Sequence, residues 1–331
     1  MRIRRPRPAA GAATTPAAPE AGLPDGAAFG LPERVPFDGS DGALPRVAAI
    51  TMARDEGAMI RRWAEHYAAQ LGAENVFVVD DHSTDGSTDD LPATVLRLPY
   101  LDKFGFEQSR LGILNNLASA FLFAYDAVLS ADADEFVVAD PVRHAGLREF
   151  VATTAGRDVV GVLGYNVVQD LANEKPLDFD RPLLSQRSYA KFMPLMCKPM
   201  LKWAAVPWAR ASHGVRAPYE IDTDLFMFHF KFADLDLLAA RAGHRNALNE
   251  TENRAAASSW SRSADVMVDL MKTVDQQIAT PSEQQFRPRQ RQVDRIVQPK
   301  GPNWKAVGPG QVQAMETADV LRIPPRFRDL V

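Results

Sequence analysis

Two aspartates, Asp132 and Asp134, are separated by one residue and follow the apolar run AYDAVL. In an extended segment alternate side chains point the same way, so the two carboxylates would share a face about 7 Å apart. They repel each other unless water or a cation lies between them. Carboxylate oxygens with few histidines nearby suit Mg²⁺ or Mn²⁺, which also bind substrate phosphates. The spacing predicts a metal site for a diphosphate-bearing substrate, and the alternative is a solvated acidic turn.

A second acidic pair, Asp80-Asp81, ends the apolar run NVFVV and precedes the polar loop HSTDGSTDD. That loop is rich in residues that cap helices or bond their own backbone, so a capping loop is one interpretation of the pair. The runs at 47–51 and 76–81 predict buried strands. Between them Met59, Trp63, Tyr67 and Leu71 recur every four residues and predict a helix that ends at Gly72. We expect His66 on this helix to make a buried hydrogen bond rather than to act in catalysis.

Further elements follow along the chain. The patterns predict a strand at 95–98, a helix over 109–126, a strand in AVLSADADEF, a short helix over 142–153, strands at 158–168 and 224–234, and a helix over 262–279. This alternation is typical of an α/β fold with a mainly parallel central sheet flanked by helices. Ligands of open sheets bind beyond the carboxyl ends of the strands, so both acidic pairs should face one crevice.

The composition fits a soluble enzyme or binding protein. The 331 residues are 46% hydrophobic and 24% charged, and the net charge of −4 argues against a nucleic-acid partner. The single cysteine, Cys197, excludes an intrachain disulfide and favours a reducing compartment, so we expect a cytoplasmic protein. No run is long enough for a transmembrane segment, which leaves peripheral membrane contact open. Residues 1–44, rich in Ala, Pro and Gly, should form a flexible tail.

The ordered motifs resemble those of GT-A glycosyltransferases. VFVVDDHSTDGS is followed about 50 residues later by AVLSADADEF, and ARDEGAMIRRWAEHYAAQLGAENVFVVDDHSTD is similar to the family-two-like branch with a W-x-x-H helix, a DD-x-S-x-D loop and a D-x-DEF motif. The resemblance covers residues 47–140 well and continues weakly through CKPML, SHGV and HFKFADLDLLAARAGHR. It implies a GT-A (nucleotide-diphospho-sugar transferase, Rossmann-like) domain over 45–250 and a helical and irregular C-terminal extension over 251–331.

The resemblance also implies roles for single residues at the nucleotide. Thr51 and Arg54 would border the base and ribose, and Asp81 would accept a hydrogen bond from a uracil-type base. Three further residues would help to bind the donor: Ser83, Arg110 at the start of the helix before the D-x-D strand, and Lys231 at a phosphate oxygen. For Lys231 a solvated strand edge is the alternative.

At the metal, the resemblance implies that Asp134 coordinates Mn²⁺ or Mg²⁺ and that Asp132 coordinates it too or reaches the ribose or a metal-bound water. His229 would complete the shell, with His213 as the second candidate and a satisfied core histidine as the alternative. Glu135 could bind the metal, orient a ligand or be solvated, and these three interpretations stay open. No ED motif follows, so the candidate catalytic bases are Glu220, Asp222 and Asp224.

The function implied is transfer of a hexosyl group from a nucleotide-diphosphate sugar, most simply a UDP-sugar, to a glycan or lipid-linked acceptor, as in polysaccharide biosynthesis. The first alternative is a non-catalytic GT-A-like protein that binds a sugar or a partner. A second is a D-x-D phosphohydrolase, although Phe136 holds the position where that chemistry wants Thr or Val.

Overall fold

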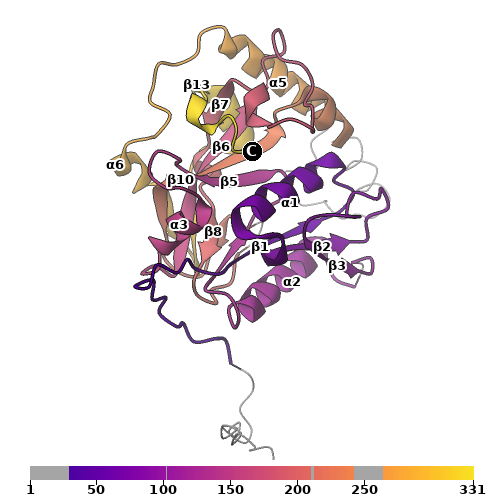
Figure 1. Cartoon of the computed structure of the whole chain (residues 1–331). Helices are drawn as coiled ribbons and strands as arrows, with labels where there is room; N and C mark the ends of the chain where they lie inside the picture. Colours follow the sequence, from indigo (N-terminus) through magenta and orange to yellow (C-terminus); the bar gives the residue numbers. More distant parts are fainter. Residues whose placement is uncertain (1–29, 102, 210–211, 242–263) are drawn as a thin grey trace, which may run out of the picture. The chain divides into compact units, whose positions relative to one another are not determined.

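The first half of the sheet forms as the alternating apolar runs predict. In the computed structural model, which describes residues 30–101, 103–209, 212–241 and 264–331, four parallel strands lie in the order β3-β2-β1-β4. β1 (Val47–Ala53) is buried at every position, because α1 (Ala58–Leu71) packs on one face and α2 (Phe106–Phe121) on the other (Figure 1). Its neighbours are β2 (Val76–Asp81), β3 (Thr94–Leu98) and β4 (Ala127–Ser130).

The second half of the sheet is mixed. The long strand β10 (Glu220–Phe232) runs parallel to β6 (Val159–Val168) and antiparallel to β5 (Glu135–Ala139), the strand that follows the D-x-D motif. Antiparallel pairs complete this half through β7 (Tyr189–Phe192), β8 (Pro199–Lys202) and β13 (Val320–Arg322). The predicted α/β class, with a central sheet flanked by helices, is confirmed, and its consecutive parallel strands lie in the N-terminal half.

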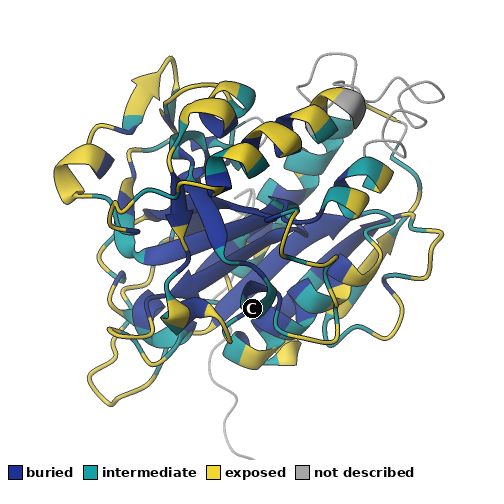
Figure 2. Ribbon diagram, turned by 90° about the horizontal axis from the view of Figure 1, so that it is seen from above, coloured by how far each residue is buried: buried dark blue, intermediate teal, exposed yellow. Residues whose placement is uncertain are grey.

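The last part of the chain packs onto the same core. The remaining elements are α3 (Leu147–Ala152), α5 (Ala264–Ile278), α6 (Gln290–Val293), α7 (Gln311–Thr317) and a small sheet of β9 (Gly214–Val215), β11 (Val297–Lys300) and β12 (Asn303–Ala306). The ring of Phe286 stacks on Tyr165 with centroids 4.3 Å apart, and Phe327 packs on Phe226 at 4.9 Å. The described residues from Pro32 to Val331 form one compact unit, and its buried strands lie at the centre of Figure 2.

Three of the expected regions include residues that are not described. These are residues 1–29 of the expected tail, residues 102, 210–211 and 242–250 of the domain expected over 45–250, and residues 251–263 of the expected extension. Within the described ranges, no helix combines the length and the apolar character that crossing a bilayer requires.

Helix α1 braces β5 as well as the core. The hydroxyl of Tyr67 donates to the carbonyl oxygen of Glu135 at 3.2 Å and accepts from the N–H of Val137 at 2.9 Å. The ring nitrogens of His66 lie 3.0 Å from the carbonyl oxygens of Val137 and Leu330. Burial lowers the pKa of His66 to about 4, so the ring is neutral at physiological pH. A neutral ring has one N–H and donates to one of these two carbonyl oxygens, which confirms the expected buried hydrogen bond of His66.

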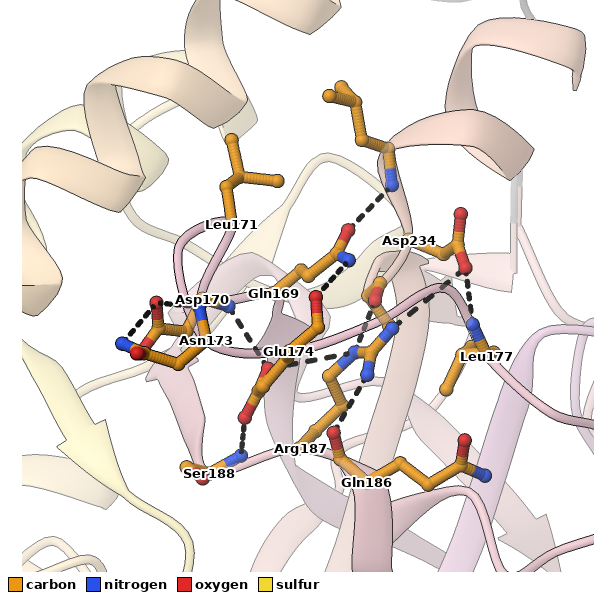
Figure 3. A network of polar contacts seen from close by, with 12 residues as sticks. Gln169, Asp170, Leu171, Asn173, Glu174, Leu177, Gln186, Arg187, Ser188 and Asp234 are labelled. Carbon is orange, nitrogen blue, oxygen red and sulfur yellow. Dashed lines mark hydrogen bonds and ion pairs between the residues drawn. The ribbon is translucent and has the colours of Figure 1, made fainter.

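A buried ionic network fixes the loop between β6 and β7 (Figure 3). The guanidinium of Arg187 lies 3.8 Å from a carboxylate oxygen of Glu174 and 3.8 Å from one of Asp234. Arg187 also donates to the carbonyl oxygens of Ala233 and Gln186, at 2.5 and 2.7 Å. Its side chain is only 1% exposed, so water does not replace these partners.

Gly164 in β6 allows a close approach of the segment that leads to Lys198. A Cβ atom at position 164 would lie 2.3 Å from the carbonyl oxygen of Met196, which is far inside van der Waals contact. The N–H of Met193 donates to the carbonyl oxygen of Gly164 at 2.9 Å, so the two backbones are held together. A side chain here would displace the backbone on which Lys198 is mounted.

Gly164→Ala is therefore expected to lower the free energy of unfolding by about 2–4 kcal/mol, because the new methyl group overlaps backbone that cannot move without breaking this contact. Chemical denaturation measures the change. Gly112→Ala is the matched control: Gly112 lies within α2 with nothing near its missing Cβ, so this change should stabilise by up to about 1 kcal/mol. Equal stability of wild type and Gly164→Ala would contradict the close approach.

Candidate active site

The loops after β1 and β2 are tied together by the side chains of the DD-x-S-x-D motif. Asp55, with a φ of 50°, accepts from the N–H of Thr84 at 2.6 Å and from that of Asp85 at 3.2 Å. The hydroxyl of Ser83 accepts from the N–H of Asp55 at 3.2 Å, and Asp85 accepts from Gly57 at 3.1 Å. Ser83, which the resemblance places at the nucleotide, thus joins one loop to the other.

The two aspartates at the end of β2 point to opposite faces, as alternation along a strand requires. Asp80 lies on the α1 face and accepts from the N–H of Ser83, the hydroxyl of Thr88 and the guanidinium of Arg97 at 2.8–2.9 Å. Burial alone would raise the pKa of Asp80, but these partners outweigh it and lower that pKa. Asp81, fully buried, lies on the α2 face beyond Val79. The capping interpretation therefore describes Asp80, and Asp81 lies on the opposite face of the sheet.

The two residues expected at the base and ribose lie in different parts of the structure. Arg54 follows β1, and its guanidinium carbon lies 4.8 Å from the centre of the Tyr100 ring. Thr51 shares a strand face with Ala49 and Ala53, which pack in the cluster beneath α1, and it is 1% exposed. The structure therefore brings Arg54 to the loop that follows β3 and leaves Thr51 in the core.

Asp132 is held by two cations. One carboxylate oxygen is bonded to the guanidinium of Arg110 in α2, and the other lies 3.2 Å from Nζ of Lys198. Burial acts to raise the pKa of Asp132, but the charges of Lys198 and Arg110 outweigh it and hold that pKa well below its usual range. Lys198 is almost fully buried, and its pKa is raised because Asp132 and Glu135 together outweigh the cost of burial. The carboxylate of Asp132 is thus ionised and fixed in place.

Asp134 faces a histidine whose tautomer is set by its neighbours. Nδ1 of His229 lies 2.7 Å from Oδ1 of Asn166, and the amide nitrogen of Asn166 donates to the sulfur of Met315 at 3.1 Å. Since Oδ1 can only accept, Nδ1 carries the proton and a neutral ring presents the lone pair of Nε2. Nε2 lies 3.5 Å from Oδ1 of Asp134. A carboxylate oxygen and Nε2 of His229 therefore face each other, and in the neutral ring Nε2 carries a lone pair.

This arrangement fits a divalent metal. The carboxylate suits Mn²⁺ or Mg²⁺, and a ligating histidine usually donates its other N–H to an oxygen, as His229 does to Asn166. In the described ranges, no three side chains of His, Cys, Asp or Glu are grouped as the ligands of one ion would be. Two protein ligands suffice where substrate phosphates and water complete the shell. Asp134 and His229 are the residues that would hold the ion, while Asp132 is turned toward its cations.

Asn166→Leu is expected to weaken Mn²⁺ binding about 10- to 100-fold, because Nδ1–H of His229 loses the acceptor that fixes the ring. Isothermal titration of Mn²⁺ in the presence of UDP measures the effect. Asn116→Ala, at an exposed position of α2, serves as the control and should leave the affinity unchanged. Unchanged affinity in Asn166→Leu would argue against His229 as a ligand.

Other candidates take different places. Nδ1–H of His213 donates to the carbonyl oxygen of Leu195 at 2.8 Å, and burial lowers the pKa of His213 to about 3, with a further contribution from the charge of Lys198. Lys231 lies two residues beyond His229 in β10 and donates to the side chain of Gln311 at 3.3 Å. Arg241 bridges Asp134 at 3.2 Å and Glu56 at 2.8 Å.

The candidate bases lie away from this cluster. Leu225 pairs with Ala139 and His229 with Glu135, so Glu220, Asp222 and Asp224 stand toward the opposite end of β5 and β10 from Asp134. Asp222 pairs with Arg157 at 2.6 Å and Asp224 with Arg287 at 2.7 Å. The structure does not bring these carboxylates to the metal candidates, and we propose no role for them as a base.

Sequence reasoning missed three residues that contact the D-x-D motif or its histidine: Asn166, Lys198 and Arg241. One polar signal was available, since Asn166 interrupts the apolar run VGVLGYNVV, and a buried amide needs partners. Lys198 lies in CKPML, which was noted only as a weak similarity. Nothing in the local pattern around Arg241 points to Asp134.

Comparisons with known proteins find fold similarity only. No protein-family model and no curated protein matches the chain. A mannosyltransferase from Pyrobaculum calidifontis in complex with GDP-Man and Mn²⁺ matches with a TM-score of 0.30 and 17% identity, over 72% of this chain and 77% of that one. Glucosyl-3-phosphoglycerate synthase from Mycobacterium tuberculosis, in complex with Mn²⁺, UDP and glucosyl-3-phosphoglycerate, matches with a TM-score of 0.29 and 16% identity, over 51% and 62%. A mannose-1-phosphate geranyltransferase from Thermus thermophilus matches with a TM-score of 0.25 and 14% identity, over 68% of each chain.

Proposed function

We propose that the protein is a GT-A glycosyltransferase of the family-two-like branch that transfers a hexosyl group from a nucleotide-diphosphate sugar, with a UDP-sugar as the first donor to test. The observation that carries the proposal is the pair formed by Asp134 and His229, in which a carboxylate oxygen lies 3.5 Å from Nε2 and Nδ1 lies 2.7 Å from the amide oxygen of Asn166. Asp81 ends a parallel strand, and ligands of open α/β sheets bind beyond the carboxyl ends of the strands. The motif resemblance to GT-A enzymes supports the same function.

Each residue has a part in this proposal. Asp81 accepts a hydrogen bond from the base, Arg54 borders the base and ribose, and Asp132 accepts from the ribose hydroxyls. Lys231 lies two residues beyond His229 in β10, and its ammonium group would meet a phosphate oxygen. Mn²⁺ or Mg²⁺ bound by Asp134 and His229 would stabilise the negative charge that the leaving diphosphate gains.

We further propose a glycan or lipid-linked acceptor and a role in polysaccharide synthesis, on the motif resemblance alone. A cytoplasmic location is proposed because the sole cysteine, Cys197, is a buried free thiol. We also expect no nucleic-acid partner, because the net charge is −4.

The test is a donor panel of UDP-, GDP- and dTDP-sugars with Mn²⁺, read by thermal stabilisation and by slow release of the nucleotide. We expect stabilisation by at least one donor, and release of the nucleoside diphosphate together with free sugar when no acceptor is present. Release of inorganic phosphate instead would favour the phosphohydrolase. Binding without any release under all donors would favour the non-catalytic alternative, and neither binding nor release would contradict the proposal.

A further inference from the structure

Glu135 is a buried carboxylate beside the metal candidates whose two oxygens are both engaged. It is 1% exposed and opens β5, where it pairs with His229 across the strands. Burying a carboxylate is costly unless charged or hydrogen-bonding partners replace its water. Oε1 accepts from Nζ of Lys198 at 2.5 Å, and Oε2 accepts from the backbone N–H of Asp132 at 3.2 Å. Both oxygens therefore face donors that belong to or contact Asp132.

These contacts close a ring around Asp132. Glu135 holds the backbone N–H of Asp132, Lys198 holds its Oδ2 at 3.2 Å, and the Lys198–Glu135 contact joins the two. Arg110 binds the remaining carboxylate oxygen from α2. The backbone and both carboxylate oxygens of Asp132 are thus fixed before any ligand arrives.

The same contacts engage both oxygens of Glu135. Each oxygen is directed at an N–H donor, Nζ of Lys198 or the backbone N–H of Asp132. The described ranges contain no group of three His, Cys, Asp or Glu side chains that would add Glu135 to Asp134 and His229 as ligands of one ion.

We propose that Glu135 and Lys198 are positioning residues that preset the Asp132 carboxylate for the donor, so that Glu135 acts through Lys198 and Asp132. The inference rests on the proposed function. A side chain that is already held in place loses less conformational entropy when a ligand binds. Removing the contacts that hold it should therefore weaken binding of the donor more than it slows turnover.

The experiment compares wild type with Glu135→Gln, Lys198→Met, the double variant and Lys198→Arg. In Glu135→Gln the new amide group turns a donor toward Lys198 or Asp132, so Asp132 is released. We expect the KM for the donor to rise about tenfold, kcat to fall less than about threefold, and Mn²⁺ affinity, titrated with the metal alone, to change less than about twofold. Lys198→Arg keeps the positive charge and should recover most of the donor affinity lost in Lys198→Met.

Denaturation of the four proteins in the double-mutant cycle tests the ring without turnover. The buried pair should show a coupling of at least about tenfold in the unfolding equilibrium constant, because the double variant removes both charges together. The matched control is the exposed pair Asp269 and Lys272 on α5, whose coupling in the cycle of Asp269→Asn and Lys272→Met should be about twofold or less.

Three results would overturn the proposal. The first is a loss of Mn²⁺ affinity in Glu135→Gln as large as in Asp134→Asn, which would make Glu135 a metal ligand. The second is additive effects of Glu135→Gln and Lys198→Met on stability, and the third is an unchanged donor KM in a folded Glu135→Gln protein. If the denaturation cycle shows the coupling but the wild-type protein turns over no nucleotide sugar, the result contradicts the proposed function and leaves the ring around Asp132 in place.

Discussion

Asp134→Asn is expected to lower Mn²⁺-dependent release of nucleotide from the sugar donor by at least about 100-fold, because the metal loses its charged ligand. An amide keeps the shape of the carboxylate but removes the negative charge beside His229 and Arg241. Steady-state release of the nucleotide, measured over a Mn²⁺ titration, gives the size of the effect. The thermal stabilisation that Mn²⁺ and UDP together give the wild type should also disappear.

The control for this change is Asp269→Asn, which removes a carboxylate from an exposed surface pair and should leave both readouts unchanged. His229→Gln should reproduce the loss of the metal response, since it removes the second ligand. Circular dichroism checks that each variant is folded. A metal response that survives in Asp134→Asn would move the metal to other residues and contradict the site.

Arg187→Met is expected to lower the free energy of unfolding by about 3–5 kcal/mol, the cost of leaving buried charges without their partner. Arg187 is the cation placed between Glu174 and Asp234, whose side chains are 10% and 3% exposed (Figure 3). These carboxylates also accept backbone N–H groups, Ser188 for Glu174 at 2.7 Å and Leu177 for Asp234 at 2.6 Å, so they cannot turn to water without unfolding the loop. Urea denaturation measures the loss.

Two further variants test the cause of the expected loss of stability in Arg187→Met. Arg187→Lys keeps the charge but loses the planar fork that also reaches the carbonyl oxygens of Ala233 and Gln186, so its loss should be intermediate. Arg295→Met, at an exposed position, should change stability by less than about 0.5 kcal/mol. If Arg187→Met were as stable as Arg295→Met, the network would contribute nothing to folding.

The N-terminal half of the fold could be predicted because its signals are local. Apolar runs buried on both faces gave β1 and β2, and a four-residue period that stops at Gly72 gave α1. The acidic ends of these strands located the crevice without any knowledge of the second half. Alternation along a strand also predicts that Thr51 lies in the core, because its neighbours at i−2 and i+2 are small apolar residues that face α1.

The second half of the site could not be predicted in the same way. His229 meets Asp134 only because β10 pairs antiparallel with β5, and Asn166 reaches His229 only because β6 pairs parallel with β10. Such registers depend on contacts between segments far apart in the chain, which no short pattern contains. The residues after Thr280 show the same limit, because β13 is a short strand whose place beside β7 is set by tertiary packing.

The contact between His66 and Leu330 joins residues 264 positions apart, and it has a consequence for synthesis of the protein. Ribosomes add about 5–20 residues each second, so α1 waits roughly 15–50 s for the segment that completes its packing. During that time the strands that carry Asp81 and Asp134 have emerged while β13, Phe286 and Phe327 have not. The nascent chain therefore exposes the apolar face that these residues later cover until they have been synthesised.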